Sequence, residues 1–288
     1  NVHLRGGFVG GVSLTPHRSP PMLSRLLPFS SLSFTASRVA SLHEFAFFNR
    51  NEGRVTSEVA YGRSEELKAK SRALRQEQVL VVFLEGEAGV GKTTLCERLE
   101  RLGYSVIHEN FVRLCAESPW PSTTVLASLE WMGKLTSRLK SETHSEIKHR
   151  DNVLFVDRSL LTPGIYARGS LATELGAICR DMHQTVTQHL PSTSILCTLE
   201  PEVLHMRVAG RLALQEGPVG DVRRQLQEED VQFVEEVRGR YAQLEKAGIF
   251  EDKLYMASTK QATAILLDML GITSSIGEVI ARSQQSRK

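Results

Sequence analysis

The chain has 288 residues, of which 41% are hydrophobic and 24% are charged, and its formal net charge is +2. This composition supports one substantial hydrophobic core, and it excludes a membrane-spanning segment because no apolar run approaches the roughly 18 residues that such a segment needs. The positive charge is small and is not concentrated in one module, so the composition does not predict nucleic acid as a partner.

The first 43 residues differ in composition from the rest of the chain. They contain no Asp, Glu or Lys, but they carry four arginines and many Ser and Leu residues. Such a composition is typical of an organelle transit peptide and predicts a mitochondrial location. The alternative is an N-terminal extension of a cytoplasmic protein. Residues 44–78 form a charged lead-in, which is predicted to be helical from residue 63.

The most specific signal in the sequence is a phosphate-binding loop. An apolar run over residues 79–85 predicts a buried strand, residues 86–93 (GEAGVGKT) match the pattern GxxxxGK[ST], and residues 93–99 predict a helix. Glycines let the backbone wrap closely around an anion, and the positive end of the helix faces the phosphates. Lys92 is expected at the β- and γ-phosphates and the Thr93 hydroxyl on Mg²⁺. The residues expected to bind ATP are Gly86, Gly89, Val90, Gly91, Lys92, Thr93 and Thr94.

The middle of the chain predicts alternating strands and helices. Pro119 and Pro121 interrupt the chain, and Ser122 or Thr123 is then predicted to cap a helix. The elements predicted here are a strand over 104–108, a helix over 123–140, a strand over 153–157 and a helix over 171–190.

The C-terminal part continues the same alternation. Pro201 is suited to the first turn of a helix, and Gly248 is suited to a helix end. The elements predicted here are a strand over 194–199, a helix over 201–212, a loop over 215–220, a long amphipathic helix over 222–246, a strand over 253–257, a helix over 260–270 and a polar tail over 272–288.

This order of elements predicts an α/β domain over residues 79–271. Strands that alternate with helices form right-handed βαβ units, so we expect a five-stranded parallel sheet with helices on both faces. Ligands of such sheets bind outside the carboxyl ends of the strands. The rule places the phosphate-binding loop, Glu109, Asp157, Arg158 and the 213–224 loop around one cleft.

Several motifs together resemble the deoxynucleoside kinase and thymidylate kinase superfamily. They are Glu85 with the glycine-rich loop, Glu109 after the second strand, residues 157–159 (Asp-Arg-Ser) after the third, and residues 199–203 (LEPEV), which lead into Arg207 and Arg211. The resemblance spans residues 79 to about 270. It implies the P-loop kinase fold with an Arg-bearing lid, a small-molecule nucleoside or nucleotide substrate, and ATP with Mg²⁺.

The resemblance also implies a role for each motif. Glu109 matches the carboxylate that takes the proton from the attacking 5′-hydroxyl, and Asp157 would act on the metal or its waters. Arg158 would hold the 5′ end of the acceptor or a transferring phosphate. Arg207 and Arg211 lie four residues apart on one helix face, and would clamp the transferred phosphoryl group.

Two features depart from the deoxynucleoside kinase pattern. A further lid arginine is expected where this chain has Ala213, and Arg223 or Arg224 could replace it from the far side of the loop. The predicted helix over 123–140 has no Gln or Asn to recognise a base, so the acceptor base is not assigned. Its apolar stripe is predicted to be core and consists of Leu126, Leu129, Met132, Leu135 and Leu139.

Three functions fit these motifs. The Asp-Arg-Ser motif favours a deoxynucleoside kinase, which transfers a phosphoryl group from ATP to the 5′ position of a (deoxy)nucleoside. A thymidylate or other nucleoside monophosphate kinase is the alternative, because residues 228–241 resemble the helix after the lid in thymidylate kinases. The third is a non-catalytic accessory subunit with a kinase fold, as in respiratory complex I. A homodimer and membership of a mitochondrial complex both stay open.

Overall fold

A computed structural model of the chain describes residues 64–108, 111–121, 124–144, 148–214, 217–226 and 230–272. The predictions made for residues 1–43, for Glu109 and for the polar tail from residue 273 onward lie outside the described residues. Among the helices that are described, none has the length and apolar character needed to cross a bilayer.

The central element is a five-stranded parallel sheet, as predicted. Its order is β2-β3-β1-β4-β5, so β1 lies in the middle, with β2 and β3 on one side and β4 and β5 on the other. Connections diverge from a central strand of this kind and leave a crevice at its carboxyl end. The strands are β1 (Leu80–Glu85), β2 (Ser105–Ile107), β3 (Val153–Asp157), β4 (Ser192–Thr198) and β5 (Asp252–Tyr255).

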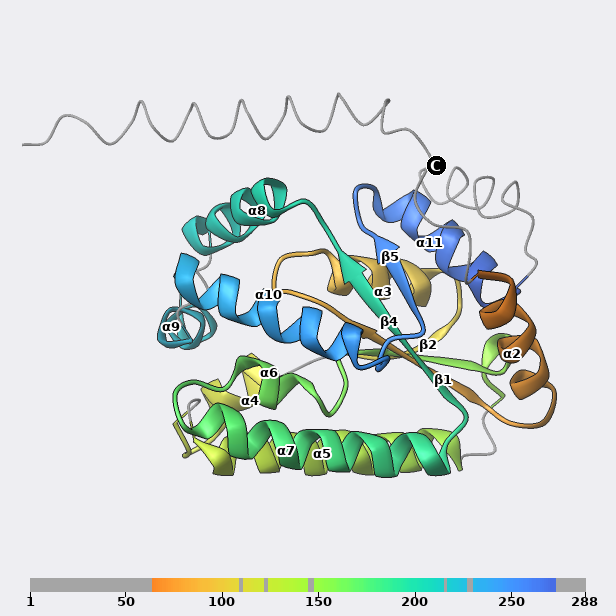
Figure 1. The fold of residues 1–288 in the computed structure, drawn as a ribbon, viewed down its shortest axis with the longest axis horizontal. Coiled ribbons are helices and arrows are strands. Elements are labelled where there is room, and N and C mark those ends of the chain that lie inside the picture. The colour runs from red at the N-terminus through yellow and green to blue at the C-terminus, as the bar shows by residue number, and fades with distance from the viewer. Residues whose placement is uncertain are drawn as a thin grey trace, which may run out of the picture. The chain divides into compact units, whose positions relative to one another are not determined.

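Helices cover both faces of the sheet (Figure 1). The longer ones are α2 (Ser64–Glu77), α3 (Lys92–Arg101), α5 (Val125–Thr143), α7 (Leu171–His189), α8 (Pro201–Leu214), α10 (Val231–Lys246) and α11 (Thr259–Met269). The shorter ones are α4 (Phe111–Glu117), α6 (Thr162–Tyr166), α9 (Pro218–Gln225) and the 3₁₀ turn η1 (Arg150–Asn152).

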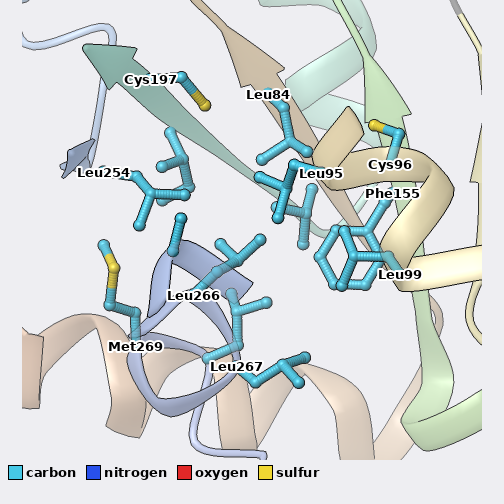
Figure 2. Close-up of a cluster of buried hydrophobic side chains, with 14 of the residues drawn as sticks. Leu84, Leu95, Cys96, Leu99, Phe155, Cys197, Leu254, Leu266, Leu267 and Met269 are labelled. Carbon is cyan, nitrogen blue, oxygen red and sulfur yellow. The ribbon is translucent and has the colours of Figure 1, made fainter. Parts of the chain in front are cut away.

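Each face of the sheet has its own core because side chains alternate along a strand. Leu80, Val82 and Leu84 of β1 pack with α2, α3 and α11. Figure 2 shows this cluster, in which side chains of α3 and α11 meet those of the strands. Val81 and Phe83 point to the other face and pack with α5 and α7. The strict alternation explains why β1 is buried along its whole length.

Helix α2 is part of this core. Leu67 is buried in the same cluster as β1. One guanidinium nitrogen of Arg75 donates to the carbonyls of Leu270 (2.9 Å) and Gly271 (3.1 Å), which follow α11. The last carbonyls of a helix have no partner within it, so Arg75 satisfies groups that would otherwise need water. The lead-in predicted from charge therefore ends in a helix that packs on the domain.

The prediction of one long helix over 222–246 is wrong, because the structure has two helices in this region. Helix α9 begins at Pro218, inside the segment predicted to be a loop, since proline is favoured in the first turn of a helix. Helix α10 has its own N-cap, Asp230, whose carboxylate accepts from the backbone N–H of Gln232 at 3.0 Å. A carboxylate at this position favours a helix start, so Asp230 separates the two helices.

Two further predictions about α5 need correction. The cap is neither Ser122 nor Thr123, but Thr124, whose hydroxyl accepts from the N–H of Ala127 at 3.4 Å. Only three of the five residues of the predicted core stripe are buried, because Leu126 is 51% exposed and Leu129 is 42% exposed. An α-helix has 3.6 residues per turn, so residues spaced three apart do not stay on one face of the helix. Other residues of α5 therefore take some of the positions that face the core. The buried residues of α5 are Ala127, Ser128, Trp131, Met132, Leu135 and Leu139.

Candidate nucleotide-binding site

The loop between β1 and α3 has the backbone that its glycines predict. Gly86, Gly89 and Gly91 all have positive φ, at 141°, 84° and 110°. A Cβ on Gly86 would lie only 2.2 Å from the carbonyl oxygen of Cys197. Such positions accept no other residue without movement of the backbone. The loop is thus packed tightly onto β4 and wraps the start of α3, which is the form of an anion-binding cradle.

Lys92 lies within this cradle. Its ammonium is buried and donates to the carbonyls of Gly86 (2.7 Å) and Glu87 (2.9 Å). The pKa of Lys92 is lowered to about 8, mainly by burial and also by the nearby Arg158, while Asp157 opposes the change. A desolvated ammonium at the start of a helix favours an incoming phosphate, which restores its charge balance.

Thr93 and Asp157 meet at the mouth of the cradle. The Thr93 hydroxyl donates to a carboxylate oxygen of Asp157 at 3.0 Å, which joins the first turn of α3 to the end of β3. A hydroxyl and a carboxylate are hard oxygen donors, and Mg²⁺ in nucleotide sites uses one or two such groups together with phosphate oxygens. The two residues therefore fit the metal expected from the sequence.

Arg158 has a backbone conformation that is unusual for a residue with a side chain. Its φ is 80°, in the left-handed region that costs a non-glycine residue about 1–3 kcal/mol. Its guanidinium donates to the Gly86 carbonyl (2.8 Å) and to the hydroxyls of Tyr166 and Tyr241 (3.2 Å each). The turn after β3 thus holds a guanidinium against the phosphate-binding loop and at the wall of the cavity.

One cavity of about 370 Å³ joins most of the predicted site residues. Two predicted residues of the loop, Gly86 and Val90, do not line it. The Val90 side chain is buried in the core, and its carbonyl accepts from Arg207 at 3.2 Å. The predicted residues that line the cavity are Gly89, Gly91, Lys92, Thr93, Thr94, Asp157, Arg158, Arg207 and Arg211.

Most of the rest of the cavity wall was not predicted from the sequence. It comes mainly from helices away from the phosphate-binding loop and is largely apolar. Its residues include Phe111 and Val112 of α4, Ser128 of α5, Tyr166 of α6, and Leu171 and Leu175 of α7. Helix α4 has only seven residues and carried no clear periodic signal, so its contribution could not be inferred.

Helix α9 supplies an arginine to the cavity. Arg223 lines it, whereas Arg224 forms an ion pair with Asp221 at 2.6 Å on the exposed side of the same helix. Ala213, where a lid arginine was expected, is exposed near the end of α8. Of the two replacements considered for that arginine, the structure therefore favours Arg223.

The burial of Lys92 predicts a link between pH and stability. Its pKa falls from 10.5 to about 8 on folding, so between these values the unfolded chain binds more protons than the folded one. The stability due to this residue is fully present above pH 10.5 and is lost as the pH falls to about 8. When the pH is raised from 8 to 10.5, we expect the free energy of unfolding of the wild type to increase by at most about 3 kcal/mol relative to that of Lys92→Ala. Urea unfolding of both proteins measures this difference. An equal pH response of the two proteins would contradict a buried, desolvated ammonium.

A family model described as an AAA domain matches residues 81–206. No curated protein sequence matches the chain. Among solved structures, deoxyadenosine kinase from M. mycoides with bound dATP is similar at 15% identity and a TM-score of 0.43, over 66% of this chain and 98% of that chain. Thymidylate kinase from Candida albicans is similar at 12% identity and a TM-score of 0.41, over 67% of this chain and 91% of that chain.

The fold itself follows from the chain's own geometry. The phosphate-binding loop joins the central strand of a five-stranded parallel sheet to a helix, and helices cover both faces. These features identify an α/β fold of the P-loop type.

Proposed function

We propose that the protein transfers the γ-phosphoryl group of ATP to the 5′-hydroxyl of a (deoxy)nucleoside. The observation that supports this best is the shared cavity, because Lys92, Thr93 and Asp157 line it together with several arginines and with apolar side chains. Phosphoryl transfer depends mainly on positioning and charge stabilisation, which such an arrangement supplies.

The donor end of the cavity would hold the phosphates of ATP. Backbone N–H groups of the loop and the ammonium of Lys92 would bind the β- and γ-phosphates. Thr93 and Asp157 would hold Mg²⁺, which neutralises phosphate charge when it is bound. Arg207 and Arg211 of α8 would stabilise the negative charge of the transferred group.

The acceptor end would hold a nucleoside with its 5′-hydroxyl toward the γ-phosphate. Arg158 would fix the reacting end of the acceptor, and Glu109 would accept the hydroxyl proton, as the resemblance implies. The new bond joins the 5′-oxygen to phosphorus, while the bond from phosphorus to the bridging oxygen breaks and leaves ADP. Tyr166, Leu171 and Leu175 would contact the body of the acceptor.

A nucleoside monophosphate kinase is the second candidate. The observation that favours it is the presence of two more arginines, Arg168 and Arg223, in the wall of the same cavity. A planar guanidinium binds a phosphate through two hydrogen bonds, so these residues suit an acceptor that is itself phosphorylated.

One assay separates these functions. The purified full-length chain is incubated with ATP and Mg²⁺ and with a panel of deoxynucleosides and their monophosphates, and ADP and phosphorylated product are measured. ADP formation that depends on a nucleoside supports the proposal, and dependence on monophosphates alone supports the second candidate. ATP binding without turnover on any acceptor would overturn both and support a non-catalytic accessory subunit.

A further inference from the structure

Glu85, the last residue of β1, is fully buried and organises its surroundings. One of its carboxylate oxygens accepts from the Ser159 backbone N–H (2.6 Å), the Ser159 hydroxyl (2.7 Å) and the Thr162 hydroxyl (3.0 Å). The other oxygen accepts from the Tyr241 hydroxyl at 2.9 Å. A buried carboxylate requires such donors, so Glu85 fixes the turn that contains Arg158 and ties it to α10.

Tyr241 is the residue of α10 that reaches the phosphate-binding loop. Its side chain is buried and packs against Phe250. Its hydroxyl lies 2.9 Å from Glu85, 3.0 Å from the Gly86 carbonyl and 3.2 Å from a guanidinium nitrogen of Arg158. Burial raises the pKa of Tyr241 well above its usual range, and Glu85 raises it further, so the hydroxyl keeps its proton.

A second contact joins α10 to the same loop. Arg238 lies three residues before Tyr241, on the same helix face. Its guanidinium forms an ion pair with Glu87 of the loop at 3.1 Å. Helix α10 therefore holds two successive parts of the loop, at Gly86 and at Glu87. The same helix follows α9, which carries Arg223 into the cavity.

The carbonyl of Gly86 is where these contacts converge. It accepts from Lys92 (2.7 Å) and Arg158 (2.8 Å), which match its two lone pairs. The Tyr241 hydroxyl lies 3.0 Å away and shares its single proton between this carbonyl and Glu85. A phosphate in the cradle would draw the Lys92 ammonium away and leave the carbonyl to the other two donors.

We propose that Tyr241 is a positioning residue, which holds the Gly86 carbonyl and the Arg158 guanidinium in register and links occupancy of the phosphate-binding loop to helix α10. The inference rests on the proposed function only in requiring that the loop binds phosphate. It adds to the phosphate-binding site a residue that lies outside the motif of the loop. Its consequence is that phosphate binding makes α10 more rigid.

The test measures binding and not turnover, so that it stands apart from the assay above. Pyrophosphate binding is measured by calorimetry on the full-length wild-type chain and on Tyr241→Phe, which keeps the ring and removes the hydroxyl. We expect the dissociation constant to rise about tenfold, a loss of about 1.4 kcal/mol. Tyr104→Phe is the matched control, because it removes a hydroxyl that donates to the Asp151 carboxylate at 3.1 Å, away from the cavity. Its affinity should equal that of the wild type.

Hydrogen–deuterium exchange supplies a readout that a purely structural role would not change. Pyrophosphate should increase the protection of residues 231–246 in the wild type and in Tyr104→Phe, but not in Tyr241→Phe. Arg238→Gln is a second variant that spares the core, since Arg238 is partly exposed, and it should weaken binding about threefold.

Each outcome decides the proposal. Wild-type affinity and an unchanged protection response in Tyr241→Phe would overturn it, as would a response in the wild type that is absent from α10. If Tyr241→Phe does not fold, full affinity in Arg238→Gln together with no α10 response in the wild type would overturn it. Binding without turnover in the wild type would overturn the proposed function alone, and no binding by the wild type would overturn both.

Discussion

Replacement of Lys92 by alanine is expected to lower turnover and the affinity for ATP by about 10²–10³-fold, an effect typical of the loss of one preorganised charged donor. Among the residues that the structure describes, the Lys92 ammonium is the one side-chain donor of the loop that is buried inside the cradle. Because burial lowers the pKa of Lys92 to about 8, the free protein gains little from its charge near neutral pH. The variant should therefore fold with unchanged or slightly higher stability.

The measurement is a titration with ATP and with pyrophosphate by calorimetry, combined with thermal unfolding of the same samples. Lys134→Ala is the control, because it removes a lysine that forms an ion pair with Glu130 on the surface of α5. It should bind normally. Unchanged ATP affinity in Lys92→Ala, with a normal unfolding transition, would refute the assignment of residues 86–93 as the phosphate-binding loop.

Replacement of Glu109 by glutamine is expected to lower turnover by about 10²–10⁴-fold while ATP binding is preserved. The amide keeps the size of the side chain but cannot accept the proton of the 5′-hydroxyl. Residue 109 follows β2 by two positions in the sequence, and the resemblance to deoxynucleoside kinases assigns it this role.

Steady-state turnover and ATP affinity are measured on the same preparation of this variant. Glu100→Gln is its control, since Glu100 pairs with His108 at 3.2 Å on the surface of α3. A Glu109→Gln protein that retains wild-type turnover would show that Glu109 is not the base.

The sheet and its loop could be predicted because their signals are local. The run over 79–85 is apolar without interruption, as a strand buried on both faces must be. It is followed at once by glycines whose positive φ the structure confirms. The ends of the observed strands differ from the predicted ones by at most two residues.

The helices over residues 218–246 could not be predicted because the local signals there conflict. Periodic apolar residues continue from Val222 to Leu244, so the amphipathic pattern favoured one helix. Pro218 and Gly217 resembled a loop, although a glycine followed by proline also begins a helix. Helix α6 was missed for a similar reason, since Pro163 and Gly164 lie inside its five residues.

Residues of the candidate site that belong to sequence motifs could be predicted. Residues that reach the site only through tertiary packing could not. Arg158, Arg207 and Arg211 were expected near the phosphates, and the structure places all three on one cavity. The contact between Tyr241 and Glu85 joins residues 156 positions apart, and nothing in the local sequence of either one specifies the other. Such contacts follow only from the fold.

Helix α2 limits how far the chain can be shortened from its N-terminus. Loss of residues up to Glu77 would remove Leu67 from the core and leave the carbonyls of Leu270 and Gly271 without Arg75. A protease that trims the N-terminal segment must therefore cut before Ser64 to leave a stable domain. The same boundary applies to any fragment produced for crystallisation, which should retain the whole of α2.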